Sequence, residues 1–315
     1  MIDTLHIWLP IERVGKLDLD LFAKNLQGIE NIQTEFGELK VRGKLKNLNV
    51  LLTSTGISIK GSLPKFYQGN NLKELSIREI KSAINKIEDD LSVPISKAKL
   101  TRIDIGFNFS MKYEPKFYFD GLGEKSQMFR GLVNSTSLYY KNSLKTMNFY
   151  DKNKEFYKTT RFPEWFKIEK NLLRYELRIK RKLGNVFENR EVLVSDLFDE
   201  RFCKKIITLW AKYYFQIKKN NLVEFKPELI SAIKDYVDYL TFIGIFEIRE
   251  KIPRDIQLLK SISAFHSIEY YSRLLAKINL IGSNEKISHE SELNKELDLK
   301  IKGILREWGI DKFQN

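Results

Sequence analysis

Three tyrosines and a row of lysines fall within one short stretch, STSLYYKNSLKTMNFYDKNKE, residues 135–155. If SLYYK is a strand, Tyr139 shares a face with polar residues and Tyr140 shares the opposite face with a leucine. The run KTMNFYDK places Tyr150 and Lys152 on a polar face in the same way. A phenolate can attack a phosphodiester to form a phosphotyrosine, and a lysine can stabilise the developing charge. The same residues also suit an ordinary half-buried strand with exposed lysines. This stretch alone therefore does not distinguish a nucleophilic tyrosine from a structural one.

Two further strand-like runs each present one acid among cations. The run KLTRIDIGFNF puts on one face Arg102, Asp104, Gly106 and Asn108, and LLRYELRIKR puts on one face Arg174, Glu176, Arg178 and Lys180. If these strands are neighbours, Asp104 and Glu176 can together hold a hard divalent cation. Alternatively, each acid only pairs with the arginines of its own strand. The residues alone leave both interpretations open.

The elements that must position these side chains are mainly strands. DTLHIWLPI alternates, and NVLLTSTGISIKGS predicts a hairpin that turns near Thr55 and Gly56. A helix follows, with a capping box at Ser76 and Glu79 and an end before Pro94. This order predicts an α+β fold, an antiparallel-dominated sheet with a helix packed on one face.

The character of the chain changes after about Gly184, where helical periodicity takes over. We expect two domains, an α+β domain over residues 1–188 and an all-helical C-terminal domain over residues 189–315. Apolar stripes predict buried helix faces at Phe202, Ile206, Trp210, Tyr213 and Ile217, at Leu229, Ile233, Tyr236 and Leu240, and at Leu293, Leu297, Ile301, Leu305 and Trp308.

Composition favours a polyanionic partner. The 315 residues include 54 Lys and Arg against 41 Asp and Glu, a formal net charge of +13, and 12% aromatic residues that can stack on bases. Nucleic acid is therefore expected before an anionic membrane. Cys203 is the only cysteine, which excludes a disulfide framework and a thiolate metal cluster and suits the cytoplasm. No apolar run approaches the eighteen or so residues of a membrane span.

Four motifs, in their order and spacing, carry a resemblance to a known family. They are GSLPKFYQGNNL, KLTRIDIGFNF, SLYYKNSLKTMNFYDKNKE and NLLRYELRIKRKL. Together they resemble the phage and plasmid replication proteins of the gene II/X type, which are rolling-circle initiators of filamentous phages, plasmids and mobile elements. The resemblance covers roughly residues 1–220. It implies a nickase-like fold and a metal-dependent, site-specific DNA-nicking endonuclease that joins the cut strand to a tyrosine and later reseals it.

Carried over to these motifs, the resemblance implies specific roles. Tyr139 would be the nucleophile, with the adjacent Tyr140 as its rival, and Lys152 the transition-state cation. Asp104 and Glu176 would be ligands for Mg²⁺ or Mn²⁺. More familiar rolling-circle nickases use two histidines separated by one apolar residue, a pair that this chain lacks, so the carboxylates would carry the metal.

Several residues are expected to contact DNA. In the expected loop GSLPKFYQGNN, Lys65 would meet phosphate, and Phe66 or Tyr67 would stack on a base. On the polar strand faces the candidates are Arg102, Asn108, Lys141, Arg174, Arg178 and Lys180.

The expected partners are origin duplex and single-stranded DNA, with no membrane. The helical domain would bind duplex, form a homodimer or recruit a host helicase. Two alternatives remain open: a non-catalytic DNA-binding replication accessory factor or repressor, and a conjugative relaxase with the same chemistry. A tyrosine recombinase is disfavoured, because the chain has no tyrosine after Tyr271.

Overall fold

The structure is a computed structural model that describes residues 1–33, 39–133, 136–159, 170–181, 183–188, 190–220, 222–223, 228, 230–248, 251–282, 288–289 and 291–310. The chain divides into two compact units. One comprises Met1–Phe119, Glu124–Lys218 and Asp298–Asn315, and the other comprises Asp120–Gly123 and Lys219–Leu297. The functional division expected between residues 188 and 189 stays a prediction.

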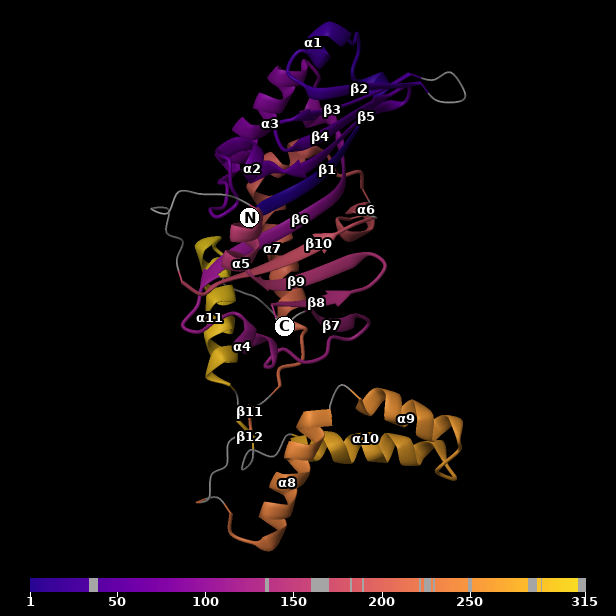
Figure 1. Ribbon diagram of the computed structural model, residues 1–315, viewed down its shortest axis with the longest axis vertical. Helices are drawn as coiled ribbons and strands as arrows, with labels where there is room; N and C mark the ends of the chain where they lie inside the picture. Colours follow the sequence, from indigo (N-terminus) through magenta and orange to yellow (C-terminus); the bar gives the residue numbers. More distant parts are fainter. Residues whose placement is uncertain are drawn as a thin grey trace. The chain divides into compact units, whose positions relative to one another are not determined.

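A ten-stranded sheet forms the first unit (Figure 1). Its strand order is β2-β3-β4-β5-β1-β6-β10-β9-β8-β7, and neighbouring strands pair antiparallel. The α+β fold with an antiparallel sheet is therefore confirmed. The strands are β1 Ile2–Pro10, β2 Gln27–Gln33, β3 Leu39–Leu45, β4 Leu48–Thr53, β5 Gly56–Ser62, β6 Lys99–Ser110, β7 Phe129–Val133, β8 Ser137–Lys141, β9 Lys145–Asp151 and β10 Leu172–Ile179.

Helix α3, Ile77–Leu91, forms where the sequence predicts it. Ser76 Oγ accepts a hydrogen bond from the Glu79 backbone N–H at 3.3 Å, and the Glu79 carboxylate accepts one from the Ser76 N–H at 2.7 Å. This capping box satisfies two backbone donors at the start of the helix. The predicted hairpin is also present as β4 and β5.

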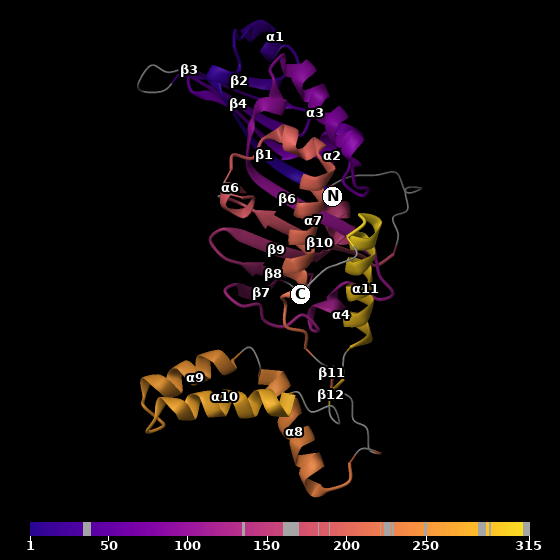
Figure 2. The same cartoon turned by 180° about the vertical axis from the view of Figure 1, so that it is seen from behind.

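Helix α7, Glu200–Phe215, covers β6, β9 and β10 on one face of the sheet (Figure 2). The Trp210 ring lies 4.7 Å from the ring of Phe107 and 4.9 Å from that of Tyr175. The Tyr175 hydroxyl donates a hydrogen bond to the Trp210 carbonyl oxygen at 3.0 Å. Because alternate strand residues fill this apolar face, the intervening polar residues lie on the opposite face of the sheet.

Two segments differ from the sequence predictions. The expected loop at residues 61–71 contains helix α2, Leu63–Gln68, which Ser62 caps and Gly69 ends with a φ of +84°. Lys152 does not continue strand β9 but begins helix α5, Lys152–Thr159.

The other helices of this unit are α1 Leu19–Ala23, α4 Lys116–Phe119 and α6 Leu183–Val186, with 3-10 turns at Ile11–Arg13, Ile95–Lys97 and Val194–Phe198. Helix α11, Glu292–Glu307, continues from the second unit into the first.

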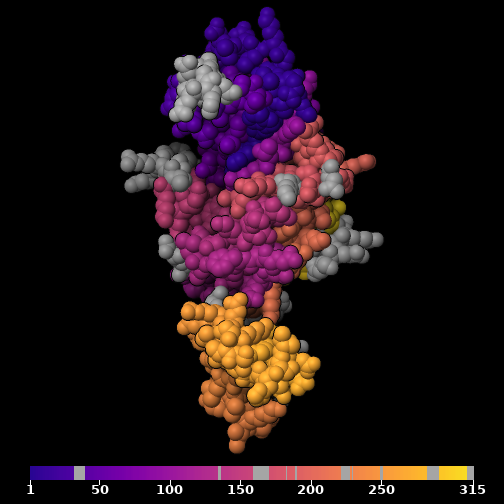
Figure 3. All heavy atoms as spheres, turned by 90° about the vertical axis from the view of Figure 1, so that its right-hand side faces the viewer, coloured from indigo at the N-terminus to yellow at the C-terminus, as the bar shows by residue number. Residues whose placement is uncertain are grey.

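The second unit contains α8 Ile233–Ile248, α9 Ile252–Ser261, α10 Ile268–Gly282 and a bridge between β11 Leu222–Val223 and β12 Ser288–His289. These helices, orange in Figure 3, bury Phe242, Ile256 and Tyr271. The predicted burial of the α8 stripe is wrong, because Ile233, Tyr236 and Leu240 are 87, 45 and 49% exposed; α8 buries Phe242 instead. Leu229, from the same predicted stripe, lies outside the described residues. Within the described ranges, no helix is long and apolar enough to cross a membrane.

Candidate active site

Five strands place one residue each in a single row across the polar face of the sheet. Gly131 of β7 pairs with Tyr139 of β8, which pairs with Asn148 of β9. Asn148 also pairs with Glu176 of β10, which pairs with Gly106 of β6. The predicted strand faces of Tyr139 and Glu176 are confirmed, and the sheet brings these two side chains to either side of Asn148.

A pocket of about 490 Å³ lies over this row. Its lining residues come mainly from β7 to β10 and from α5, and include Tyr139, Asn148, Tyr150, Glu176 and Lys158. The pocket therefore gathers two of the three candidate tyrosines and one of the two candidate metal ligands. Asp104, the other candidate ligand, is not among the lining residues.

The Tyr139 ring lies across Gly131 on the neighbouring strand. A Cβ added at Gly131 would stand 2.4 Å from Tyr139 Cζ and 2.5 Å from its hydroxyl oxygen, so only glycine leaves room for the ring there. Tyr140 is completely buried on the opposite face, with its ring edge-on to Phe149 at 6.2 Å. The prediction of Tyr140 as a rival nucleophile does not fit this position, because core packing shields its hydroxyl from DNA.

Tyr150 is hydrogen-bonded to Glu176, the carboxylate of the row. Its hydroxyl donates a hydrogen bond to Glu176 Oε1 at 2.9 Å. Burial, and then the charge of Glu176, raise the pKa of Tyr150 well above its ordinary value. Burial also raises the pKa of Glu176, although Arg174 opposes this shift. Tyr150 is therefore a neutral hydrogen-bond donor that holds Glu176 in place.

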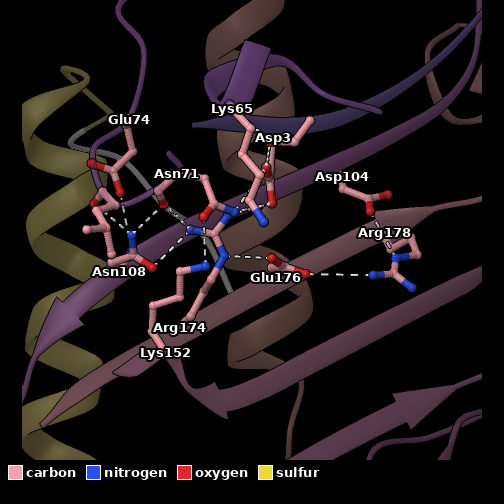
Figure 4. Close-up of polar contacts among 12 residues, drawn as sticks. Asp3, Lys65, Asn71, Glu74, Asp104, Asn108, Lys152, Arg174, Glu176 and Arg178 are labelled. Atoms are coloured by element: carbon pink, nitrogen blue, oxygen red, sulfur yellow. Dashed lines mark hydrogen bonds and ion pairs between the residues drawn. The ribbon is translucent and has the colours of Figure 1, made fainter. Parts of the chain in front are cut away.

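Arg174 of β10 joins its own strand to β1 and β6 through hydrogen bonds and ion pairs (Figure 4). Its side chain is 3% exposed, and its guanidinium donates to Glu176 Oε1 at 2.6 Å, to Asp3 Oδ2 at 2.9 Å and to Asn108 Oδ1 at 2.9 Å. Burial would lower the pKa of Arg174, but Asp3, Tyr150 and Glu176 together raise it well above the ordinary value. The expected contact of Arg174 and Asn108 with DNA does not fit these positions, since both side chains bind other protein groups.

Asp3 is a member of this cluster that sequence reasoning missed. It is 6% exposed and accepts a hydrogen bond from Ser62 Oγ at 2.6 Å. Burial would raise its pKa, but Arg174 and Ser62 lower the pKa to about 2. Strict alternation in β1 puts Asp3 on the apolar face with Leu5. The register of β1 against β6 shifts between Ile2 and Leu5, which turns Asp3 to the polar face.

Lys152 is buried and is not among the residues that line the pocket. Its side chain is completely buried and donates to Asn71 Oδ1 at 2.8 Å and to Glu155 Oε2 at 2.5 Å. Burial, and then Arg174, lower the pKa of Lys152, against the effect of Glu155. The lysines of α5 that line the pocket are Lys154 and Lys158.

The two carboxylates proposed as metal ligands are bound by guanidinium groups. Asp104 accepts two hydrogen bonds from Arg102, at 2.8 and 2.6 Å, and one from Arg178 at 3.0 Å. Glu176 pairs with Arg174 and lies 3.8 Å from Arg178 Nη2. Across the described ranges, no three His, Cys, Asp or Glu side chains form a group that could hold a metal ion. As arranged, these residues are an ion-pair network and do not fit a divalent cation.

The α2 segment presents one of the two predicted rings at its surface and buries the other. Phe66 is 1% exposed, and Lys46 Nζ lies 4.8 Å from its ring centre, so the prediction that Phe66 stacks on a base is wrong. A helix turns this side chain inward, where a loop would have left it free. Tyr67, the predicted alternative, is 37% exposed, and its stacking on a base stays a prediction. The Lys65 ammonium is partly exposed and lies 4.0 Å from the Glu155 carboxylate.

Cations continue along the polar face beside the row. Arg102 and Arg178 keep 22 and 30% of their side chains exposed while they bind Asp104. Lys141 is exposed at the end of β8. Burial, and then Lys141 and Arg178, lower the pKa of Lys180. Their contact with DNA stays a prediction.

His6 supplies a pH test of this face. It lies on β1 opposite Arg102 and Lys60. Burial, and then these two cations, lower its pKa to about 4 from 6.5. The imidazole of His6 takes up a proton below pH 6.5 in the unfolded chain but only near pH 4 in the folded chain. The free energy of unfolding should therefore fall as the pH is lowered from 6.5 to 4. We expect His6→Gln to flatten the fall, measured by urea denaturation from pH 4 to 7. Equal slopes for the two proteins would contradict this assignment.

Comparison with known proteins assigns more than half of the chain to a family. A family model for the N-terminal domain of a replication-associated protein of phages, the gene II protein, matches residues 1–193, more than half of the chain. The matched residues include every strand of the sheet, the row and the pocket lining. No curated protein matches the chain.

Proposed function

The chain belongs to the family of phage replication-associated proteins that share the N-terminal domain of the gene II type, and on that premise we propose that it nicks DNA by attack of Tyr139 on a phosphodiester. This membership agrees with the resemblance of the four motifs. The observation that carries the proposal is the pocket that Tyr139 lines together with Glu176, Arg178 and Lys158. We assign DNA as the substrate because the family acts in replication, and Tyr139 as the nucleophile because it lines the pocket.

The proposed step is a transesterification. Tyr139 Oη bonds to phosphorus, and the bond from phosphorus to the 3′ oxygen breaks. The phenol loses its proton and the departing 3′ oxygen gains one, so no further reagent is required. The 5′ phosphate stays on the protein, and the free 3′ hydroxyl can prime synthesis. Attack by a later 3′ hydroxyl on the phosphotyrosine would reseal the strand.

Charge on the pocket suits this chemistry. Lys154, Lys158 and Arg178 line it together with three acids, each of which has a cation partner. Cations there favour binding of a phosphodiester and stabilise charge on its oxygens. Dependence on Mg²⁺ or Mn²⁺ is a separate part of the proposal. We assign no step to the metal, because arginines bind Asp104 and Glu176.

Gly131 should act as a positioning residue for Tyr139. A methyl group at this position would overlap the Tyr139 ring, so we expect Gly131→Ala to slow adduct formation about 10²-fold, the scale of a displacement near 1 Å. Affinity for single-stranded DNA should stay close to wild type, which a general loss of structure would not allow. Gly303→Ala is the matched control, since an added Cβ at Gly303 meets nothing within 4 Å. Equal rates in both variants would contradict the role of Gly131.

The proposed function is tested with a supercoiled plasmid that carries the protein's own gene region. The plasmid is incubated with the protein in Mg²⁺, in Mn²⁺ or with EDTA, and the denatured products are examined for DNA attached to protein. We expect a nick with a covalent adduct, and loss of both with EDTA would support metal dependence. Tight binding with neither nick nor adduct, on DNA known to contain the origin, would favour a non-catalytic accessory factor.

Other partners belong to the same proposal. Origin duplex, a host helicase and a second copy of the chain are candidate partners of the helical unit. The plasmid assay does not depend on which of them binds there.

A further inference from the structure

Asn148 occupies the centre of the row, between the proposed nucleophile and the carboxylate. It is directly opposite Tyr139 on one side and Glu176 on the other. Directly opposed strand residues have Cβ atoms about 4.5–5.5 Å apart, so both neighbours lie within reach of one bound group. Asn148 also lines the pocket.

The amide of Asn148 lacks the hydrogen bonds that its neighbours have. The Glu176 carboxylate, for example, accepts hydrogen bonds from both Tyr150 and Arg174. In the part of the chain that the structure describes, the Asn148 side chain makes no hydrogen bond to protein, although it is half-buried. Polar groups in such positions normally have a partner. Its two N–H donors are therefore available to a ligand in the pocket.

The charges around Asn148 point to a phosphate group. Three carboxylates line the pocket, and each has a cation partner. Glu155 and Glu176 are bound by the buried cations Lys152 and Arg174 respectively, and Asp151 lies 3.5 Å from Lys154 Nζ. Because those cations offset the acids, the other cations of the lining, Lys158 and Arg178, leave the pocket suited to an anion. A neutral amide adds directional donors for the oxygens of that anion.

We propose that Asn148 Nδ2 donates a hydrogen bond to a non-bridging oxygen of the phosphodiester that Tyr139 attacks. This rests on the proposed function and adds a substrate-contacting residue to it. Charge on that oxygen grows as the phenol attacks, so the hydrogen bond strengthens in the transition state. Removal of one such donor typically costs about 10²–10³-fold in rate.

The test compares stereochemically pure phosphorothioates at the mapped cleavage position of a single-stranded oligonucleotide. In the wild-type protein, sulfur at the oxygen bound by Asn148 should slow single-turnover cleavage more than sulfur at the other one. In Asn148→Ala the all-oxygen rate should fall about 10²-fold and this difference should vanish. Asn148→Asp, which cannot donate and adds negative charge, should be slower still. Asn49→Ala is the matched control, because Asn49 is an exposed strand asparagine of β4 that also makes no side-chain hydrogen bond to a described residue.

Two results would overturn the assignment. One is an Asn148→Ala protein that is slower but keeps the full difference between the two phosphorothioates. The other is an Asn148→Ala protein in which only the preferred base beside the cut has changed.

A binding measurement separates this inference from the proposed function. If the wild-type protein forms no adduct, the proposed function fails, and anisotropy with the fluorescent oligonucleotide still decides on Asn148. Affinity of Asn148→Ala equal to wild type would then reject the phosphate contact.

Discussion

Tyr139→Phe should form no covalent adduct with DNA, while its affinity for single-stranded DNA stays close to wild type. The substitution removes one oxygen and keeps the ring that lies over Gly131. Loss of a covalent nucleophile lowers the rate on the order of 10⁶-fold, which puts the adduct below detection. The measurement is a gel of labelled oligonucleotide after denaturation, beside an anisotropy titration of the same probe. A second readout is the map of the modified peptide, which should contain Tyr139.

Tyr150→Phe is the matched control for that experiment. It also removes a phenol oxygen from the pocket, but the hydroxyl group of Tyr150 is engaged in a hydrogen bond to Glu176. We expect the adduct to persist, with a loss of about 1–3 kcal/mol in stability because a buried carboxylate loses a donor. If Tyr150→Phe abolished the adduct and Tyr139→Phe did not, the chemistry would stand and the assigned nucleophile would be wrong.

Arg174→Met should destabilise the protein by about 3–5 kcal/mol, the cost of leaving buried charge without its partner. Asp3 and Glu176 are 6 and 5% exposed, and both lose the same guanidinium. Urea denaturation at pH 7 measures the effect. Arg102→Met is the control, because Asp104 keeps Arg178 and should lose much less stability. A loss for Arg174→Met no larger than that of the control would refute the role of Arg174 in the cluster.

The pH dependence of this variant has a defined sign. In the wild type the Asp3 pKa is lowered to about 2 from 3.8, so its stabilising effect is present above pH 3.8 and is lost as the pH falls through 2. Without Arg174, burial favours the protonated carboxyl groups of Asp3 and Glu176. The difference in unfolding free energy between wild type and Arg174→Met should therefore shrink as the pH is lowered from 7 to 4.

Patterns with a strict period were readable from the sequence. Alternation in β6 and β10 placed Asp104 and Glu176 on one face, and the capping box placed the start of α3. Both patterns depend on local geometry, which each residue type imposes on its own neighbours. The faces of Tyr139 and Tyr140 followed from the same rule.

Breaks in a pattern were harder to read. The register shift beside Asp3 depends on the pairing of β1 with β6, which is distant in the sequence. The helices that begin at Leu63 and Lys152 have local signals instead, since Ser62 and Asp151 accept hydrogen bonds from backbone N–H groups of the first turn, but short strand and loop patterns obscured them. Asn71 joins the cluster from a loop, through Asp3. Ion pairing of the acids was one of two interpretations, and only the positions of the arginines distinguished it from a metal site.

The position of Tyr139 has a mechanical consequence. It lies on the second strand from one margin of the sheet, whereas Arg174 braces β1, β6 and β10 at the middle. None of the residues of the edge strand β7 at that margin is buried, and regions with few buried contacts open at a lower free energy than the core. On the proposed mechanism, the strand that would hold one end of a severed DNA chain therefore lies next to an edge that can open while the braced middle keeps its shape. Such a protein would have to keep hold of that end while the other is extended, and an edge that opens beside a rigid centre meets both demands.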